Sequence, residues 1–309
     1  MFESVRKQLL EQVRIHALSR TAIEENQQRN LDRVRASMTE REREFWNEDR
    51  VFTPEDLRHE QINSPPWGVW GDRTATWPRV SSGSSGQQRL RFPYNFEQVL
   101  SAGVGAARAF DVRGITRKDA LFAYDPGRMY AGHMTIKAAF ALILPGHVIE
   151  SQVTTMAEKV RQCLDDQVTF ICGVPRNLEK MARYVIEHGI QMPLRGCVST
   201  GYAFTTEQQD LIRNAFRCEI IDLYGQVECG NIFWSCNHDQ RHVNIDLTMI
   251  KNKNHKSFFT GLSVMPLFNY YNGDRLEYHW PESACGCGSH LPVVTRFETG
   301  LNKNYQNKE

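Results

Sequence analysis

Short apolar segments alternate with amphipathic ones through the middle of this chain, and that alternation constrains its fold most strongly. Four runs rich in β-branched or aromatic residues read ALFAY (120–124), VTFICGV (168–174), GCVST (196–200) and EIIDLYG (219–225). Segments with helical periodicity lie around them, at 96–110, 152–166, 176–188 and 205–217. The pattern predicts an α/β fold in which a parallel sheet has helices on both faces. In such sheets, ligands bind at the carboxyl ends of the strands.

The flanking regions differ from this central part. Residues 1–50 mix charges of both signs with apolar residues at helical spacing, which predicts one or two exposed amphipathic helices. Residues 53–80 contain four prolines and three tryptophans, a composition typical of an irregular segment over a core. The C-terminal quarter is β-like. We therefore expect an N-terminal helical and irregular segment at 1–78, an α/β core at 79–230 and a β-rich region at 231–309.

Composition narrows the possible partners. The chain has 309 residues, of which 41% are hydrophobic, and its 37 basic and 36 acidic side chains leave a net charge of +1. This balance argues against nucleic acid or an anionic membrane as the partner. The longest apolar run, AAFALIL (138–144), is too short to span a bilayer and predicts a buried strand or helix. Because the N-terminus lacks the features of a signal peptide, we expect a cytoplasmic protein.

Cysteine and histidine spacing predicts a metal site. Cys236 and His242 form a Cys-x₅-His pattern, and Cys285 and Cys287 follow as Cys-x-Cys. Thiolate and imidazole are the ligands that zinc prefers, and four of them form a closed structural site. His238 competes with His242 for the fourth position, and unpaired surface thiols are the alternative interpretation.

A serine- and glycine-rich run, SSGSSGQQR (81–89), has the composition of either a flexible linker or a phosphate-binding loop. It is not a Walker loop, because the Gly-Lys-Ser/Thr ending is missing. Its glycines allow a close backbone approach, its serines offer donors and its arginine adds a cation, so the residues suited to phosphate are Ser81, Ser82, Gly83, Ser84, Ser85, Gly86 and Arg89.

Two later motifs favour the phosphate loop. IIDLYGQVECG (220–230) and PLFNYYNGDRLEY (266–278) follow the serine run in a fixed order. The set resembles the adenylate-forming superfamily of acyl-CoA ligases, and within it phenylacetate-CoA ligase and related aryl-CoA ligases, over residues 79 to 297. The resemblance implies the fold of that family's large N-terminal domain and the use of ATP and Mg²⁺. Some aryl-CoA ligases also bind zinc at a similar cysteine and histidine arrangement.

The resemblance assigns roles to individual positions. It implies that the serine loop and Arg89 contact the β- and γ-phosphates, and that Glu228 coordinates Mg²⁺. Asp274 is expected to bind the ribose hydroxyls, although a turn residue is the alternative interpretation at that position. The residues expected to line or flank the adenine are Gly201, Tyr202, Asp222, Tyr224 and Gly225. The residues expected to line a pocket for a flat aromatic acid are Tyr130, Met134, Ile232, Phe233 and Trp234, each of which could instead belong to the core.

The sequence departs from the family in several places. Val227 replaces the usual threonine of the tyrosine motif, Ser84 and Ser85 replace threonines, and Arg89 replaces a lysine. The chain ends where the family has a Gly-Arg-x-Asp hinge followed by a small C-terminal domain. These features predict a truncated member similar to the adenylating enzyme of phenazine biosynthesis.

The expected activity is adenylation of an aromatic carboxylic acid as a half-reaction. The activated acid would pass to a downstream reductase or acyl-acceptor protein in secondary metabolism, such as antibiotic biosynthesis. Two alternatives are a fragment of a complete aryl-CoA ligase and a non-catalytic module that binds an aryl acid or nucleotide. A homodimer is expected only because homodimers are common.

Overall fold

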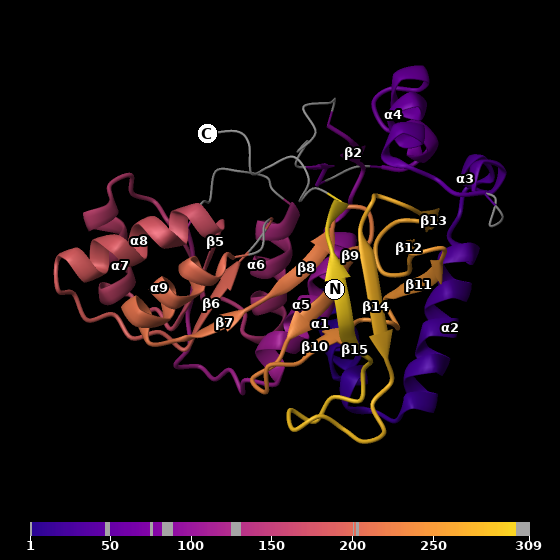
Figure 1. The fold of residues 1–309 in the computed structure, drawn as a ribbon. Coiled ribbons are helices and arrows are strands. Elements are labelled where there is room, and N and C mark those ends of the chain that lie inside the picture. Colours follow the sequence, from indigo (N-terminus) through magenta and orange to yellow (C-terminus); the bar gives the residue numbers. More distant parts are fainter. Residues whose placement is uncertain are drawn as a thin grey trace.

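The computed structural model describes residues 2–46, 50–74, 77–81, 89–124, 131–199, 201 and 204–300. Two five-stranded sheets, one parallel and one antiparallel, stand side by side with helices around them (Figure 1). Among the described residues, none of the helices combines the length and the apolar character needed to cross a lipid bilayer.

The parallel sheet has the strand order β4-β3-β5-β6-β7. Its strands are β3 (Leu121–Ala123), β4 (Val148–Glu150), β5 (Phe170–Gly173), β6 (Gly196–Ser199) and β7 (Glu219–Ile221). The helices between them are α6 (Ala131–Ile143), α7 (Met156–Asp165), α8 (Pro175–Glu187) and α9 (Thr206–Phe216). This arrangement confirms the predicted α/β unit and adds β4, a strand that the sequence pattern did not reveal.

Alternate residues of the parallel strands face two different helical layers, as the two-residue repeat of a strand requires. Phe122 and Ile171 pack into a core with α7, α8 and α9. Their neighbours Leu121 and Phe170 face the layer that contains α5 (Phe96–Asp111) and α6. All four side chains are fully buried, so both faces of the sheet are covered. Continuous apolar runs in these strands follow from that burial on both faces.

The antiparallel sheet has the order β14-β15-β10-β9-β8. Its strands are β8 (Leu223–Gln226), β9 (Gly230–Ser235), β10 (Arg241–Val243), β14 (Arg275–His279) and β15 (Val293–Glu298). A three-stranded sheet of β11 (Thr248–Lys253), β12 (Lys256–Gly261) and β13 (Leu267–Tyr270) adjoins it, and a short hairpin pairs β1 (Arg79–Val80) with β2 (Arg91–Phe92).

The chain passes from the parallel to the antiparallel sheet at Asp222. The run EIIDLYG, which the pattern predicts as one strand, is divided there into β7 and β8. The backbone N–H of Asp222 donates to the Ser235 hydroxyl at 2.8 Å, and its carbonyl accepts from the Ser235 N–H at 2.8 Å. This local pairing with β9 ends the parallel pairing of β7 with β6, and the chain continues directly from one sheet into the other.

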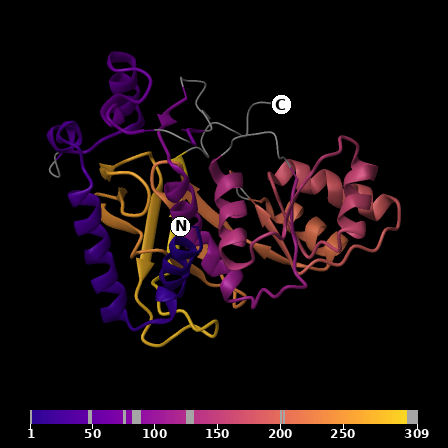
Figure 2. The same ribbon diagram turned by 180° about the vertical axis from the view of Figure 1, so that it is seen from behind.

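The N-terminal helices lie against both halves of the molecule. They are α1 (Phe2–Arg14), α2 (Arg20–Ala36), α3 (Glu40–Phe45) and α4 (Pro54–Asn63), with single 3₁₀ turns at Ile15–Ala17 and Gly68–Trp70. Figure 2, seen from behind, shows α1 beside α5 and α6, against which it packs. The helix α4 falls in a region expected to be irregular. Its start is marked by Thr53, which forms a capping box with Asp56 before Pro54 opens the first turn.

Candidate functional site

Tyr224 and Asp274, fifty positions apart in the sequence, meet at one end of the antiparallel sheet. The Tyr224 hydroxyl donates to the Asp274 carboxylate, which also accepts from the Asn272 amide at 2.7 Å and from the Gly300 backbone N–H at 2.9 Å. Burial and the adjacent Asp274 charge raise the pKa of the Tyr224 hydroxyl. The carboxylate predicted to bind ribose is therefore surrounded by donors, and the tyrosine predicted to contact adenine holds it.

Aromatic rings surround Tyr224 on the same sheet. Its ring centroid lies 4.4 Å from that of Phe297 on β15 and 5.2 Å from that of Phe233 on β9. Phe233 is opposite Tyr224 in the β8–β9 register, so the two side chains share one face. The rings are tilted or perpendicular to one another, so they form an edge-packed aromatic cluster beneath Tyr224, whose own ring is half-buried.

Glu228 lies in the turn between β8 and β9, within electrostatic range of Asp274. Its Oε1 accepts a hydrogen bond from the Tyr270 hydroxyl at 3.0 Å. Burial raises the pKa of the Glu228 carboxyl, and the negative charge of Asp274 raises it further. Two carboxylates so placed repel one another unless a cation lies between or near them, which is the electrostatic requirement for a divalent-metal ligand.

The base of the serine loop is the part that the structure describes. The Ser81 N–H donates to the Leu90 carbonyl, and the Ser81 hydroxyl oxygen accepts from the Leu90 N–H, both at 2.9 Å. Ser81 therefore closes the base of the loop, a role not expected from the sequence. Arg89 is exposed. The predicted phosphate residues Ser82, Gly83, Ser84, Ser85 and Gly86 lie outside the described residues.

The residues predicted to flank the adenine have different surroundings. The Asp222 carboxylate pairs with the Arg241 guanidinium at 3.0 Å, while burial raises the pKa of the Asp222 carboxyl. A β-carbon on Gly225 would lie 2.7 Å from the Gly230 carbonyl oxygen, so only glycine allows the close approach of β8 and β9. Gly201 is exposed after the end of β6. Tyr202 lies outside the described residues.

The predicted acid pocket is only partly supported by the positions of its residues. Ile232, Phe233 and Trp234 are consecutive in β9, and all three belong to the buried core. Neighbouring strand residues point to opposite faces, so the three cannot line a single pocket. Only Phe233 lies beside Tyr224. Met134, in the first turn of α6, is half-buried, and Tyr130 lies outside the described residues.

Trp234 belongs instead to a buried polar cluster behind the sheet. Its indole N–H donates to the Asn244 side-chain oxygen at 3.1 Å. The same oxygen accepts from the Arg108 guanidinium at 2.9 Å, and Arg108 makes a bidentate pair with Asp246, with both N–O distances 2.7 Å. Arg108, Asn244 and Asp246 are fully buried. The interpretation of Trp234 as a core residue therefore fits this structure.

The polar cluster continues to the backbone of Tyr224. The Asn244 amide donates to both the side-chain oxygen and the carbonyl of Asn231, at 2.8 and 3.0 Å. Asn231 in turn donates to the Tyr224 carbonyl at 3.2 Å. Sequence reasoning missed this chain of contacts. The only sequence signal was Arg108 within the otherwise apolar face of a helix, a position where arginine is rare unless it is paired.

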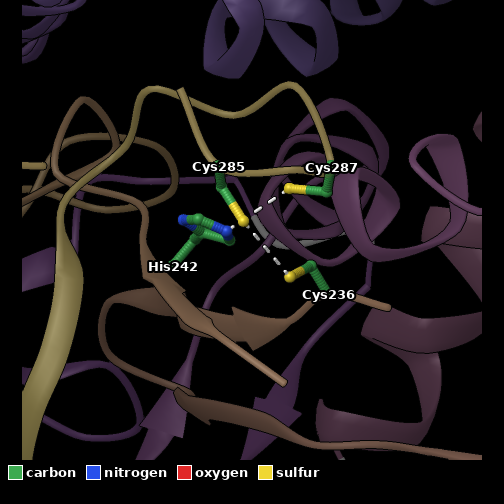
Figure 3. Close-up of side chains that lie close together, drawn as sticks. All are labelled: Cys236, His242, Cys285 and Cys287. Atoms are coloured by element: carbon green, nitrogen blue, oxygen red, sulfur yellow. Dashed lines mark hydrogen bonds between the residues drawn. The ribbon is translucent and has the colours of Figure 1, made fainter. Parts of the chain in front are cut away.

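Four predicted metal ligands converge on one point in Figure 3. The ligand atoms of Cys236, His242, Cys285 and Cys287 all lie within 4.8 Å of one another. The Cys236 and Cys285 sulfurs are 3.8 Å apart, and the Cys287 sulfur is 3.4 Å from His242 Nε2. The first two ligands come from the β9–β10 hairpin and the other two from the loop between β14 and β15. Chain segments more than forty residues apart therefore supply one set of donors.

The surroundings of this cluster suit a closed zinc site. His242 Nδ1 lies 3.4 Å from the Leu291 carbonyl, an orientation that leaves Nε2 facing the three sulfurs. The backbone N–H of His238 donates to the Cys236 sulfur at 3.3 Å, and hydrogen bonding with Cys287 lowers the pKa of the Cys236 thiol. His238, the alternative fourth ligand, is not among the converging residues; its ring lies against Gly286. The donor set therefore fits zinc in type and number.

No protein-family model matches the chain, and no curated protein matches it. Solved structures do match. A 2-hydroxyisobutyryl-CoA ligase in complex with 2-HIB-AMP and CoA superposes with a TM-score of 0.74 and 16% identity, over 93% of this chain and 70% of that one. The same ligase in an open conformation has a TM-score of 0.67 and 17% identity over 79% of this chain, which spans only 58% of that structure. The structure of VinN has a TM-score of 0.51 and 17% identity, with coverage of 71% and 60%.

Proposed function

We propose that this chain, which has the fold of the large domain of adenylate-forming ligases, activates a carboxylic acid with ATP. A carboxylate oxygen of the acid attacks the α-phosphorus of ATP, the bond from that phosphorus to the bridging oxygen breaks, and acyl-AMP and pyrophosphate form. The observation that carries the proposal is the convergence of Tyr224, Asp274 and Glu228 on one end of a sheet. The structurally similar ligase binds an acyl-AMP, which supports the same chemistry here.

Each residue of this group has a role in positioning the nucleotide. Asp274 accepts the ribose hydroxyls, in place of one or more of the donors that now surround it. The Tyr224 ring and its aromatic neighbours offer a surface for the adenine. The serine loop from Ser81 to Gly86 and Arg89 bind the terminal phosphates. Alignment of the carboxylate with the α-phosphorus accounts for most of the rate enhancement, because the protein supplies no nucleophile.

Glu228 would hold Mg²⁺ at the phosphates. The ion would neutralise phosphate charge and stabilise the charge that develops as pyrophosphate leaves. The structure supports this assignment because Glu228 and Asp274 repel one another, and a divalent cation would relieve that repulsion. A carboxylate oxygen is also the kind of ligand that Mg²⁺ prefers.

The acid that we propose is aromatic, and the basis for this part of the proposal is the resemblance in sequence to aryl-CoA ligases. Phe233 shares a face of the sheet with Tyr224 but is buried, so it would support the Tyr224 ring rather than contact the acid. The acyl-adenylate would then pass to an acceptor, either CoA, as the similar ligase suggests, or a downstream reductase or acyl-acceptor protein in secondary metabolism. We place the activity in antibiotic biosynthesis of the phenazine type only because of the resemblance in sequence.

The test is ATP–pyrophosphate exchange measured against a panel of aromatic and small aliphatic carboxylic acids. We expect exchange that depends on an aromatic acid and that falls about 100-fold or more in Glu228→Ala, because metal-held charge is lost. Glu187→Ala, an exposed carboxylate at the end of α8, is the matched control and should keep full exchange. Nucleotide binding without exchange for any acid would support the non-catalytic binding module instead.

The acceptor needs a separate measurement. Thioester formation from CoA in the same reaction mixture would identify a CoA ligase, whereas accumulation of acyl-AMP in the presence of CoA would support transfer to another protein. Mass spectrometry of the products distinguishes the two results.

We also propose that the Cys236, His242, Cys285 and Cys287 cluster holds a structural zinc ion. A closed set of three thiolates and one imidazole leaves no position for substrate, so the ion would join the β9–β10 hairpin to the β14–β15 loop. Elemental analysis should find one zinc per chain, and Cys285→Ser should lose it and unfold at a lower denaturant concentration. Cys218→Ser, which changes a buried thiol outside the cluster, should keep its zinc. Wild-type protein without zinc would contradict the assignment.

A further inference from the structure

Arg79, the first residue of β1, is a buried cation without a matching anion. Its side chain is 2% exposed. Within the described part of the chain, its guanidinium donates one long hydrogen bond, from Nη1 to the Pro78 carbonyl at 3.5 Å, and lies 5.9 Å from the Trp77 ring centroid. Nη2 is buried and has no hydrogen-bond partner. No carboxylate in the described ranges forms an ion pair with it.

Such a group is costly to bury. A guanidinium keeps its charge in a protein, and an ionised group removed from water is normally paired and hydrogen-bonded. Burial lowers the pKa of the Arg79 guanidinium. An apolar side chain of similar length would fill the same space without that cost, so packing alone does not account for an arginine at this position.

Tyr94 connects Arg79 with the proposed nucleotide site. Arg79 is directly opposite Phe92 in the β1–β2 register, so the two side chains share the buried face of the hairpin. Two residues beyond Phe92, the Tyr94 hydroxyl donates to the Val227 carbonyl, next to Glu228. The charges of Arg79 and Glu228 both act on the pKa of that hydroxyl, with opposite signs, so both groups lie within electrostatic range of Tyr94.

We propose that Arg79 is a phosphate-binding residue, whose guanidinium pairs with phosphoryl oxygens of the nucleotide at Glu228. This rests on the proposed ATP-dependent function for the source of the phosphate. The guanidinium offers two parallel N–H groups that match two oxygens of a phosphate, and Nη2 is already free to donate. Arg79 and a cation held by Glu228 would together neutralise the phosphates, and the phosphate would supply the anion that Arg79 lacks.

The test compares the full-length wild type with Arg79→Met and Arg79→Lys. Binding of adenosine, AMP, ATP and metal-free pyrophosphate is measured by calorimetry, and unfolding is measured without ligand. We expect Arg79→Met to bind ATP and pyrophosphate about 10- to 100-fold more weakly, since one charge-assisted contact is lost, and to bind adenosine as the wild type does. Arg79→Lys should recover part of the loss, because it keeps the positive charge but not the two parallel N–H groups of the guanidinium.

Arg91→Met is the matched control. Arg91 lies in the same hairpin, on β2, but its side chain is exposed and on the opposite face. It should keep both phosphate affinity and stability, apart from small effects of net charge.

The outcomes separate this proposal from the proposed function. If wild type and Arg79→Met bind ATP and pyrophosphate equally well, the phosphate role of Arg79 is wrong, whatever reaction the protein catalyses. If the wild type binds no adenine nucleotide but binds pyrophosphate in an Arg79-dependent way, the anion site stands and the ATP-dependent function fails. Should Arg79→Met prove less stable without ligand while keeping its ligand affinities, Arg79 is a structural residue only.

Discussion

Arg108 and Arg79 are both buried, yet their surroundings are opposite. Arg108 is enclosed by acceptors: it pairs in bidentate fashion with Asp246 at 2.7 Å, reaches Asn244 at 2.9 Å and donates to the backbone carbonyls of α1. Among the described residues, Arg79 has one long hydrogen bond, to the Pro78 carbonyl, and its Nη2 has no partner. Glu228 differs again: it is half-buried, accepts a hydrogen bond from Tyr270 and lies within electrostatic range of Arg58.

The difference distinguishes a structural cluster from an incomplete site. At Arg108 the chain supplies every counter-charge itself, so the group joins α1, α2 and α5 to the antiparallel sheet and needs no ligand. At Arg79 the described residues supply no counter-charge, and the phosphate proposed above would supply it. A buried charge therefore indicates a binding site only where its partner is missing.

Removing the partner of Arg108 should have the largest effect. Asp246→Ala leaves a fully buried guanidinium without its counter-ion, and we expect the free energy of unfolding to fall by about 3–5 kcal/mol. Denaturant unfolding measures the change. Asp210→Ala, an exposed carboxylate on α9, should shift it by less than about 0.5 kcal/mol. If Asp246→Ala lowers the free energy of unfolding only slightly, the distinction between Arg108 and Arg79 is wrong.

Gly105 offers a second way to disturb the cluster of Arg108, Asn244 and Asp246, without changing a charge. A β-carbon there would collide with the Asn244 amide and approach the Asn231 carbonyl oxygen to 3.1 Å. Overpacking of this kind costs about 1–3 kcal/mol, partly offset by the better helix propensity of alanine. Gly105→Ala should therefore unfold at a lower denaturant concentration than the wild type. Ser101→Ala, at a half-buried position of the same helix, should not.

Glu228 should make the free energy of unfolding depend on pH in a characteristic way. Because burial raises the pKa of this carboxyl in the folded protein, the folded state holds its proton more tightly than the unfolded state does. The stabilisation is complete below the usual glutamate pKa of 4.5 and is lost as the pH rises through the raised value. Stability curves of wild type and Glu228→Gln should diverge over this window, and added Mg²⁺ with ATP should reduce the divergence. Parallel curves would contradict the raised pKa of Glu228.

Arg79→Met should have the smallest effect on stability. Because no ion pair is broken, we expect the free energy of unfolding without ligand to change by less than about 1 kcal/mol, in either direction. The same measurement in saturating ATP should separate the two proteins, since only the wild type gains the full stabilisation from its ligand. Destabilisation comparable to that of Asp246→Ala would make the two arginines equivalent and contradict the comparison.

Local sequence patterns were enough to predict the strands and helices of the parallel sheet. The apolar runs at β3, β5 and β6, and Pro175 at the start of α8, depend on neighbours within one turn or strand. The convergence of Cys236, His242, Cys285 and Cys287 was also predictable, because the spacing of the cysteines and the histidine is typical of a metal site. The capping box at Thr53 shows that a further helix, α4, was legible in the sequence and was overlooked.

Other features depended on partners that no local pattern reveals. The sequence placed Ile232, Phe233 and Trp234 together, but the pleat of β9 separates their side chains, and only the pairing with β8 brings Phe233 to Tyr224. Asp222 ends one strand because Ser235, thirteen residues later, pairs with it.

The sequence by itself determined the α/β class, the order of the motifs and the donor types of the proposed metal site. Only the tertiary structure decided which buried charges have a partner of opposite charge. Arg108 finds Asp246 across 138 positions, whereas Arg79 finds no carboxylate among the described residues. The physical reason is that the cost of burying a charge depends on what lies within a few ångströms in space, and chain folding rather than sequence distance sets those neighbours.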